Sequence, residues 1–122
     1  MGQKILIMVT FGENYPDRLE PPLHLATLGA ALDAEVTMVY SMSGGLLLKK
    51  GNAERIVPMA GKKTYLETVQ EVKEFGVKIF VCSPTLERYG LTKEDFIDEV
   101  DDVVGGMYFI TEALEADVTF TF

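Results

Sequence analysis

Apolar and polar positions along the chain change their period several times, and these changes predict strands that alternate with helices. Three runs are almost continuously apolar, as expected for strands buried on both faces: residues 4–10 (KILIMVT), 35–40 (EVTMVY) and 77–82 (VKIFVC). A weaker strand is expected over residues 100–104. In the last segment, residues 118–122, apolar residues alternate with threonines, which predicts a half-exposed strand at an edge or at an oligomer contact.

The helices between these strands are marked by caps and by apolar residues at helical spacing. Pro21 and Pro22 favour the first turn of one helix. Thr64 and Glu67 form a capping box that begins another, which ends at Gly76. The apolar stripes expected on the helices are Leu25, Leu28, Gly29 and Leu32, then Leu66, Val69, Val72 and Phe75, then Met107, Ile110 and Leu114.

Shorter elements complete the pattern. Ser43 is the expected N-cap of a short helix that ends at Gly51, and Thr92 is the expected cap of another. Residues 52–63 show no regular pattern, and residues 83–90 form a loop or a short helical turn. The order of elements predicts one α/β domain over residues 1–122, with three layers (α/β/α) and a mostly parallel sheet of about five strands.

Charge and hydropathy exclude two kinds of partner. The formal net charge is −8, so phosphate backbones should repel the chain and nucleic acid is not an expected partner. There is no continuous apolar run of membrane-spanning length, so no membrane partner is expected. The segment MGQKILIMVTF has a short apolar stretch without a small-residue cleavage site, which favours a first strand over a signal peptide. The expected location is therefore the cytoplasm.

The charges are unevenly distributed along the chain. Lysines and arginines gather in residues 49–63, and aspartates and glutamates gather in residues 94–102. The basic stretch has the composition to orient a partner or attract an anion, but both stretches also fit plain solvated faces. The acidic stretch does not match a calcium-loop spacing.

Cys82 is the one cysteine and the one candidate nucleophile. A lone cysteine excludes an intramolecular disulfide, a Cys-x-x-Cys pair and a multi-cysteine zinc site, and the lone His24 leaves no histidine-rich metal site. No metal or cofactor is therefore predicted. Cys82 ends the third strand, at the sheet edge where doubly wound folds form their sites. Ser83 and Pro84 are good helix starters, and unpaired N–H groups at a helix start favour a thiolate. The same residue fits a small buried core hydrophobe equally well.

The segment around this cysteine resembles the DsrE/DsrF-like family and its TusD relatives. The matching pieces are Gly76 and Val77 before the strand, Cys82 at its end, and Gly90 and Leu91 after a step of eight residues. The Gly-Leu-Leu-Leu turn after the second strand and the closing Ala-Asp-x-x-apolar-x-Phe segment also have counterparts in the family. One departure is the pair Arg88-Tyr89, where TusD-like members have two arginines, which weakens the match to their branch.

The resemblance implies a homo-oligomer, commonly a trimer or hexamer, that works in sulfur relay. In that role Cys82 accepts sulfane sulfur as a persulfide and passes it to a partner thiol. The further expected partners are donor and acceptor proteins, and the possible enzyme class is sulfurtransferase. A single cysteine suffices because the resolving thiol belongs to the partner. The alternative function is a non-catalytic oligomeric module of the same fold that binds a small ligand or a protein.

Several residues are candidates to line such a site. Backbone N–H groups after Cys82 could stabilise a persulfide anion. His24 lies after the first strand, where it could serve as a base for Cys82 or simply be a surface residue. Gly44 lies in a turn that could offer backbone donors to an anion or could be a plain helix cap. The complete set of candidate binding residues is Ser83, Thr85, Arg88, His24, Asn14 and Gly44.

The spacing Cys-x5-Arg, from Cys82 to Arg88, also occurs in the oxyanion loop of protein tyrosine phosphatases. Here the intervening residues include no glycine, Pro84 removes one N–H donor, and Glu87 would repel a phosphate. The spacing is therefore weak support for phosphatase chemistry.

Overall fold

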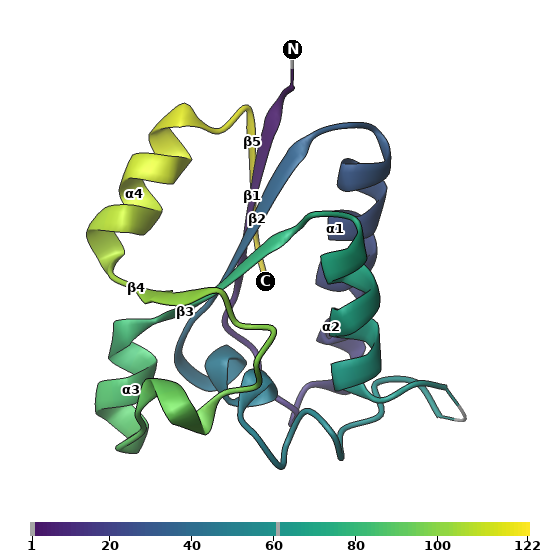
Figure 1. Cartoon of the computed structure of the whole chain (residues 1–122), viewed down its shortest axis with the longest axis vertical. Coiled ribbons are helices and arrows are strands. Elements are labelled where there is room, and N and C mark those ends of the chain that lie inside the picture. The colour runs from purple at the N-terminus through teal and green to yellow at the C-terminus, as the bar shows by residue number, and fades with distance from the viewer. Residues whose placement is uncertain (1, 61) are drawn as a thin grey trace.

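The computed structural model describes residues 2–60 and 62–122, and these fold around a five-stranded parallel sheet (Figure 1). The strand order is β4-β3-β2-β1-β5. The strands are β1 (Lys4–Val9), β2 (Glu35–Tyr40), β3 (Lys78–Cys82), β4 (Asp102–Val104) and β5 (Val118–Thr121). The α-helices are α1 (Glu20–Ala31), α2 (Tyr65–Glu74), α3 (Ser83–Tyr89) and α4 (Gly106–Glu115). Three 3-10 helices are η1 (Pro16–Arg18), η2 (Met42–Leu48) and η3 (Lys93–Asp95).

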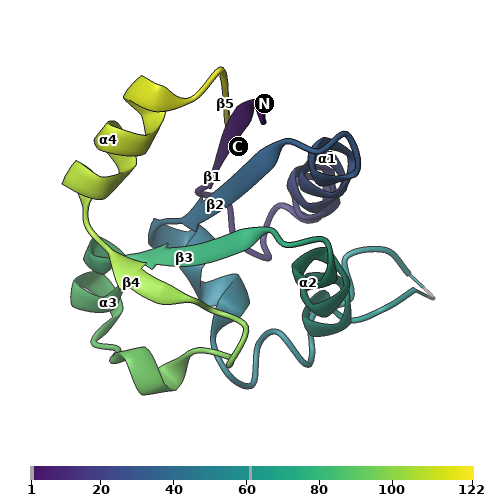
Figure 2. The ribbon, with the colours of Figure 1, turned by 45° about the horizontal axis from the view of Figure 1, so that its top comes forward.

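The helices lie on both sides of the sheet, so the predicted α/β/α architecture is confirmed. Figure 2 shows α1 and α2 together on one face and α4 on the other, with α3 near the carboxyl ends of β3 and β4. Strand β5 pairs with β1 alone and forms one edge of the sheet, as the alternating sequence predicts. Within residues 2–60 and 62–122, no helix is both long and apolar enough to cross a membrane.

Local signals in the sequence place the ends of α2 correctly. The Thr64 hydroxyl accepts from the backbone N–H of Glu67 at 3.1 Å, and the Glu67 carboxylate accepts from the backbone N–H of Thr64 at 2.9 Å. This is the predicted capping box, and it satisfies two N–H groups that the first turn leaves unpaired. Gly76 follows the helix with φ of 89°, a conformation in which a side chain would be strained.

The short element after β2 differs from its prediction. It is the 3-10 helix η2, its N-cap residue is Ser41 rather than Ser43, and its C-cap is Lys49 rather than Gly51. Gly51 instead occupies the next turn with φ of 91°. The triplet of leucines is compatible with a helical turn, but η2 is tightened into 3-10 form where it packs against α3.

The predicted apolar stripe of α1 is wrong in part. The buried residues of α1 are Pro22, Leu23, Ala26 and Gly29. Leu28 and Leu32 are 47% and 83% exposed. A methyl group on Gly29 would lie 2.8 Å from Cδ1 of Ile5, so α1 approaches the sheet too closely for large side chains at the contact. The inward side of α1 therefore combines Leu23 with the small residues Ala26 and Gly29.

The predicted stripe of α4 is on the solvent side. Met107 and Leu114 are each 82% exposed and Ile110 is 55% exposed. The side chains that pack toward the sheet include Tyr108 and Phe109, which are only partly buried. Helix α4 therefore presents apolar residues on two sides, and the sheet covers one of them.

Candidate functional site at the carboxyl ends of the strands

Cys82 is the last residue of β3 and the residue directly before α3, as the sequence predicts. Its side chain lies on the α4 face of the sheet, in a cluster with Leu6 and Val39 that Tyr108 and Phe109 of α4 flank. Cys82 is a free thiol and is 4% exposed. The thiol therefore lies at the carboxyl end of the strand, as predicted for a site, but side chains of α4 shield it from solvent.

The residues after Cys82 form a helix and not an oxyanion loop of the phosphatase kind. Because Ser83–Tyr89 is α-helical, these residues do not wrap an anion as a phosphatase loop does. Arg88 lies in the last turn, about 9 Å along the helix axis from Cys82 at 1.5 Å per residue. Its guanidinium lies 5.9 Å from the ring centroid of Tyr89. Arg88 is therefore too far along the helix to close an oxyanion loop around Cys82.

Ser83 and Thr85 occupy different surroundings. Ser83 is half-buried, and its Oγ lies 3.9 Å from the position that a Cβ of Gly105 would take. Thr85 is fully buried, and its hydroxyl donates to the carbonyl of Met42 at 3.4 Å. Ser83 thus lies between Cys82 and the start of α4, whereas Thr85 joins α3 to η2.

Gly44 and Gly45 bring η2 into direct contact with its neighbours. A Cβ on Gly44 would overlap the carbonyl of Val9, and one on Gly45 would lie 2.5 Å from Cγ2 of Thr85. The predicted role of Gly44 as an anion donor remains a prediction. Both glycines allow the chain after β2 to pack against the end of β1 and against α3.

A polar pocket of about 160 Å³ lies beside this contact, where β1 and β2 end. Its walls come from the segment after β1, from η2 and from the turn that follows η2. The lining residues are Gly12, Glu13, Asn14, Ser43, Leu46, Leu47, Asn52 and Ile56. The predicted site residue Asn14 is therefore part of a pocket, although that pocket does not include Cys82 among its lining residues.

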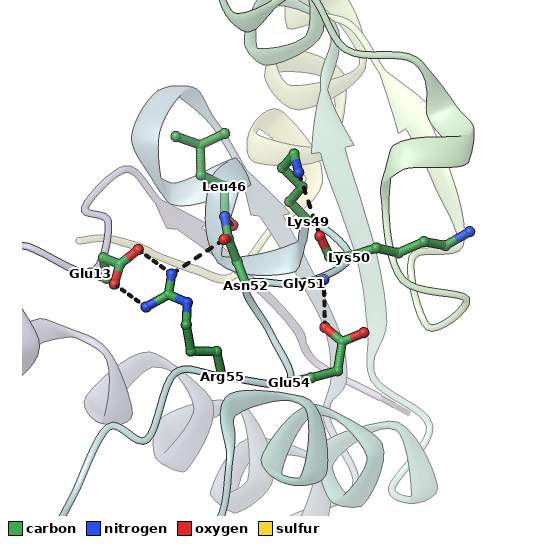
Figure 3. Close-up of polar contacts among 8 residues, drawn as sticks. All are labelled: Glu13, Leu46, Lys49, Lys50, Gly51, Asn52, Glu54 and Arg55. Carbon is green, nitrogen blue, oxygen red and sulfur yellow. Dashed lines mark hydrogen bonds and ion pairs between the residues drawn. The ribbon is translucent and has the colours of Figure 1, made fainter.

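An ion pair lies beside this pocket, between the lining residue Glu13 and Arg55 (Figure 3). The Arg55 guanidinium donates to both carboxylate oxygens of Glu13, at 2.8 and 2.9 Å. It also donates to Oδ1 of Asn52 at 3.2 Å, and Nδ2 of Asn52 donates to the carbonyl of Leu46 at 2.9 Å. The hydrogen bond from Arg55 lowers the pKa of Glu13, and the same bond raises the pKa of Arg55. Both groups therefore remain charged at neutral pH.

His24 does not reach Cys82. It lies on α1, which packs on the opposite face of the sheet from the Cys82 cluster. There it lines a cavity of about 670 Å³ together with three prolines, two carboxylates and Met59. The prediction of a His24–Cys82 pair is therefore not realised, because helix α1 and the Cys82 side chain lie on opposite sides of the sheet.

The two charged stretches are partly paired with residues outside them. In the basic stretch, Lys63 forms an ion pair with Glu71, and Arg55 pairs with Glu13. In the acidic stretch, Asp101 accepts from the backbone N–H of Ile79 at 2.8 Å. No group of three or more histidine, cysteine or carboxylate side chains suited to a metal ion occurs among residues 2–60 and 62–122.

Comparison with known proteins gives the family. The model of the DsrE/DsrF-like family matches residues 3–122. The chain belongs to the DsrE/DsrF-like family. Its fold is therefore related to that of sulfur-relay proteins, as the segment around Cys82 predicts.

Individual proteins are also similar to this chain. An uncharacterized protein of Methanopyrus kandleri, MK0008, is 32% identical over 75 residues, which cover 61% of this chain and 58% of that protein. The crystal structure of the ychN protein from E. coli matches with a TM-score of 0.81 at 18% identity, covering 98% of this chain and 99% of that one. Protein MTH1491 of Methanobacterium thermoautotrophicum, described as of unknown function, matches with a TM-score of 0.66 at 19% identity, covering 97% and 98%. At these identities the structural matches show a shared DsrE/DsrF-like fold.

The sequence interpretation missed the pairing of Glu13 with Arg55 and the part played by Asn52. Glu13 and Arg55 are 42 residues apart, and neither lies in a recognisable motif. One signal was available: Glu13 follows β1, and Arg55 falls in the long irregular segment after β2. Segments that follow parallel strands lie together at the carboxyl ends of the sheet.

Proposed function

We propose that this DsrE/DsrF-like chain is a sulfur-carrier subunit in which Cys82 accepts sulfane sulfur. The observation that carries the proposal is the position of the thiol, at the carboxyl end of β3 and directly before α3, in a family related to sulfur relay. Sites in doubly wound sheets form at this edge. We further propose the cytoplasm as its location, where a lone thiol stays reduced.

The transfer balances with one thiol on this chain. The Cys82 thiolate attacks the outer sulfur of a donor persulfide, the donor's S–S bond breaks, and the donor leaves as a thiolate. Cys82 then carries the persulfide until a partner thiolate attacks its outer sulfur and releases Cys82. Because Cys82 is 4% exposed, the proposal requires that the start of α4 moves aside during transfer. Gly105 and Gly106 begin that helix and lack side chains that would resist such movement.

The test is the intact mass after incubation with thiosulfate or a small persulfide, for wild type beside Cys82→Ser. We expect a gain of one sulfur atom in the wild type, reversed by a reducing thiol and absent in the variant. Melting temperatures of the two proteins show whether the variant still folds. If the wild type gains no sulfur, or if Cys82→Ser gains it equally, the carrier function is wrong.

The second candidate is a non-catalytic binding module, favoured by the burial of Cys82 and by the polar pocket at the ends of β1 and β2. It predicts that iodoacetamide modifies Cys82 at the same rate as global unfolding. A carrier instead predicts alkylation that is much faster than unfolding, because only the cover over Cys82 must open. Alkylation rates measured with and without a low concentration of denaturant separate the two functions.

Either function includes self-association, which we propose occurs through α4 and β5, as a trimer or hexamer of the kind the family resemblance implies. Support comes from the exposed stripe of Met107, Ile110 and Leu114, and from the edge strand, where Val118 and Phe120 are 42% and 37% exposed. Apolar patches of this kind on soluble proteins usually mark contact surfaces.

A further inference from the structure

The pocket at the ends of β1 and β2 has three walls that are held in place independently of any ligand. Close contact between Gly44 and Val9 fixes η2 against the end of β1, and a Cβ on Gly12 would lie 3.0 Å from the carbonyl of Ser43. The third wall is the turn that contains Asn52. The cavity between these walls has a volume of about 160 Å³, which is enough for several waters or a small ligand.

One carboxylate, that of Glu13, lines this pocket, and the cation bonded to it, Arg55, lies beside the lining residues. The guanidinium of Arg55 lies between the carboxylate of Glu13 and the amide of Asn52, both of which line the pocket (Figure 3). Asn52 is itself fixed by the carbonyl of Leu46. Arg55 is therefore positioned from two sides and would keep the contact with Asn52 if Glu13 moved.

The Glu13–Arg55 pair is open to solvent. The side chains of Arg55 and Glu13 are 56% and 43% exposed. Exposed ion pairs usually contribute little net stability, although the two parallel hydrogen bonds make this pair stronger than a single contact. A ligand can replace the pair only if it offers each group a new partner of opposite charge.

Two further polar side chains at the pocket are free to bind. Among the residues that the structure describes, the amide of Asn14 and the hydroxyl of Ser43 have no side-chain hydrogen bond. Leu47 and Ile56 supply apolar surface at the same pocket. The pocket thus combines one negative group, hydrogen-bonding groups without a charge and an apolar wall, and the guanidinium of Arg55 lies beside it, bonded to Glu13 and Asn52.

We propose that this pocket binds a small zwitterion of the α-amino acid class, with the ligand carboxylate on Arg55 and its ammonium group on Glu13. An anion alone would take Arg55 and leave Glu13 without its partner, and a cation alone would do the reverse. A zwitterion satisfies both groups, and a short side chain fits the remaining space beside Leu47 and Ile56. This site deepens the binding-module function and is independent of sulfur transfer on Cys82.

The experiment is an NMR titration of ¹⁵N-labelled protein with four alanine derivatives that differ in charge. L-alanine carries both charges, N-acetyl-L-alanine only the negative one, L-alaninamide only the positive one, and N-acetyl-L-alaninamide neither. We expect saturable shifts at Gly12, Asn14 and Ser43 with L-alanine at millimolar concentration, and affinity lower by about tenfold or more for the other three, since each loses a hydrogen-bonded charge. Stronger binding of N-acetyl-L-alanine would overturn the zwitterion assignment in favour of an anion site.

Matched variants test the residue roles. Glu13→Gln and Arg55→Gln should each weaken L-alanine binding by about tenfold or more. Glu115→Gln, which removes the exposed pair between Lys4 and Glu115 elsewhere, should leave it unchanged. Equal binding by Glu13→Gln and wild type, or no shift with any probe, would contradict the proposal. Sulfur loading measured on the same samples keeps a failure of this site distinct from a failure of the carrier function.

Discussion

The two faces of the sheet are covered to different depths. On the α1 and α2 face, strand residues such as Ile7, Met38 and Ile79 are completely buried, and both helices contribute buried side chains. On the opposite face the buried cluster consists of Leu6, Val39 and Cys82, and none of the ten described residues of α4 is buried.

One face of the sheet therefore contributes most of the folding free energy, and the other holds the candidate reactive thiol. Buried apolar area is the main source of folding free energy, so most of it comes from the α1 and α2 face. The α4 face has a cover that can open locally, since regions with few buried contacts open at lower free energy than the core. Cys82 lies on the face that opens more easily.

The largest expected effect compares two neighbouring residues of β3. Ile79 points to the α1 and α2 face and is 0% exposed, whereas Phe80 points to the α4 face and is partly buried. Ile79→Ala should lower the free energy of unfolding by about 2–5 kcal/mol. Phe80→Ala should lower it by about 1–2 kcal/mol despite removing a larger side chain. Urea denaturation of both variants checks this, and an equal or reversed order would mean that the faces contribute alike.

Two glycines give the next comparison. Gly44→Ala places a methyl group against the carbonyl of Val9 and should cost about 1–3 kcal/mol. At Gly106, the start of α4, no heavy atom of the surroundings lies within 4 Å of the position that a Cβ would take, so Gly106→Ala should cost nothing or stabilise by up to about 1 kcal/mol. Thermal melts of the two variants should therefore shift in opposite directions. A stable Gly44→Ala protein would show that η2 can move away from β1.

A smaller effect is expected inside the buried face, at the pair of Tyr40 and Tyr65. Both side chains are 0% exposed, and their hydroxyl groups are 2.6 Å apart. Tyr40→Phe should cost about 1–2 kcal/mol because the Tyr65 hydroxyl is left without this partner. The double variant Tyr40→Phe/Tyr65→Phe should cost less than the sum of the single changes, which a double-mutant cycle measures. An additive cycle would exclude coupling between the two hydroxyl groups.

The same pair predicts sensitivity to alkali. Burial raises the pKa of Tyr40 and of Tyr65, so the folded state favours the neutral phenols. Their contribution to stability is complete below the unfolded pKa near 10 and is lost as pH rises toward the folded values, by about 1.4 kcal/mol per pH unit for each tyrosine. Phenolate absorbance should therefore appear for these two residues together with loss of the circular dichroism signal, and earlier ionisation would contradict their burial.

The smallest effect on monomer stability is expected on the outer side of α4. Met107→Gln and Leu114→Gln replace side chains that are each 82% exposed, so the free energy of unfolding of the monomer should change by less than about 0.5 kcal/mol. If α4 is a contact between copies, the double variant should be a monomer by light scattering at concentrations where the wild type is larger. A monomeric wild type would remove the basis for this contact.

The sequence by itself determined the five strands, the helices α1, α2 and α4, and their order, because the signals are local. Continuous apolar runs mark β1, β2 and β3, the capping box of Thr64 and Glu67 marks the start of α2, and Gly76 marks its end. The position of Cys82 at the end of β3 follows from the same patterns, since a strand end and a helix start adjoin there. Membership of the DsrE/DsrF-like family was likewise visible in the residues around Cys82.

Only the tertiary structure decided which sides of the helices face inward and which distant residues meet. Helix α1 approaches the sheet most closely at Gly29, and Leu28 and Leu32 are exposed although their spacing fits an apolar stripe. The packing of the helices placed His24 and Cys82 on opposite faces, and the meeting of two segments after β1 and β2 joined Glu13 to Arg55. The physical reason is that local periodicity specifies a helix or a strand, whereas helix rotation and long-range pairs depend on the shape of the surface against which each element packs.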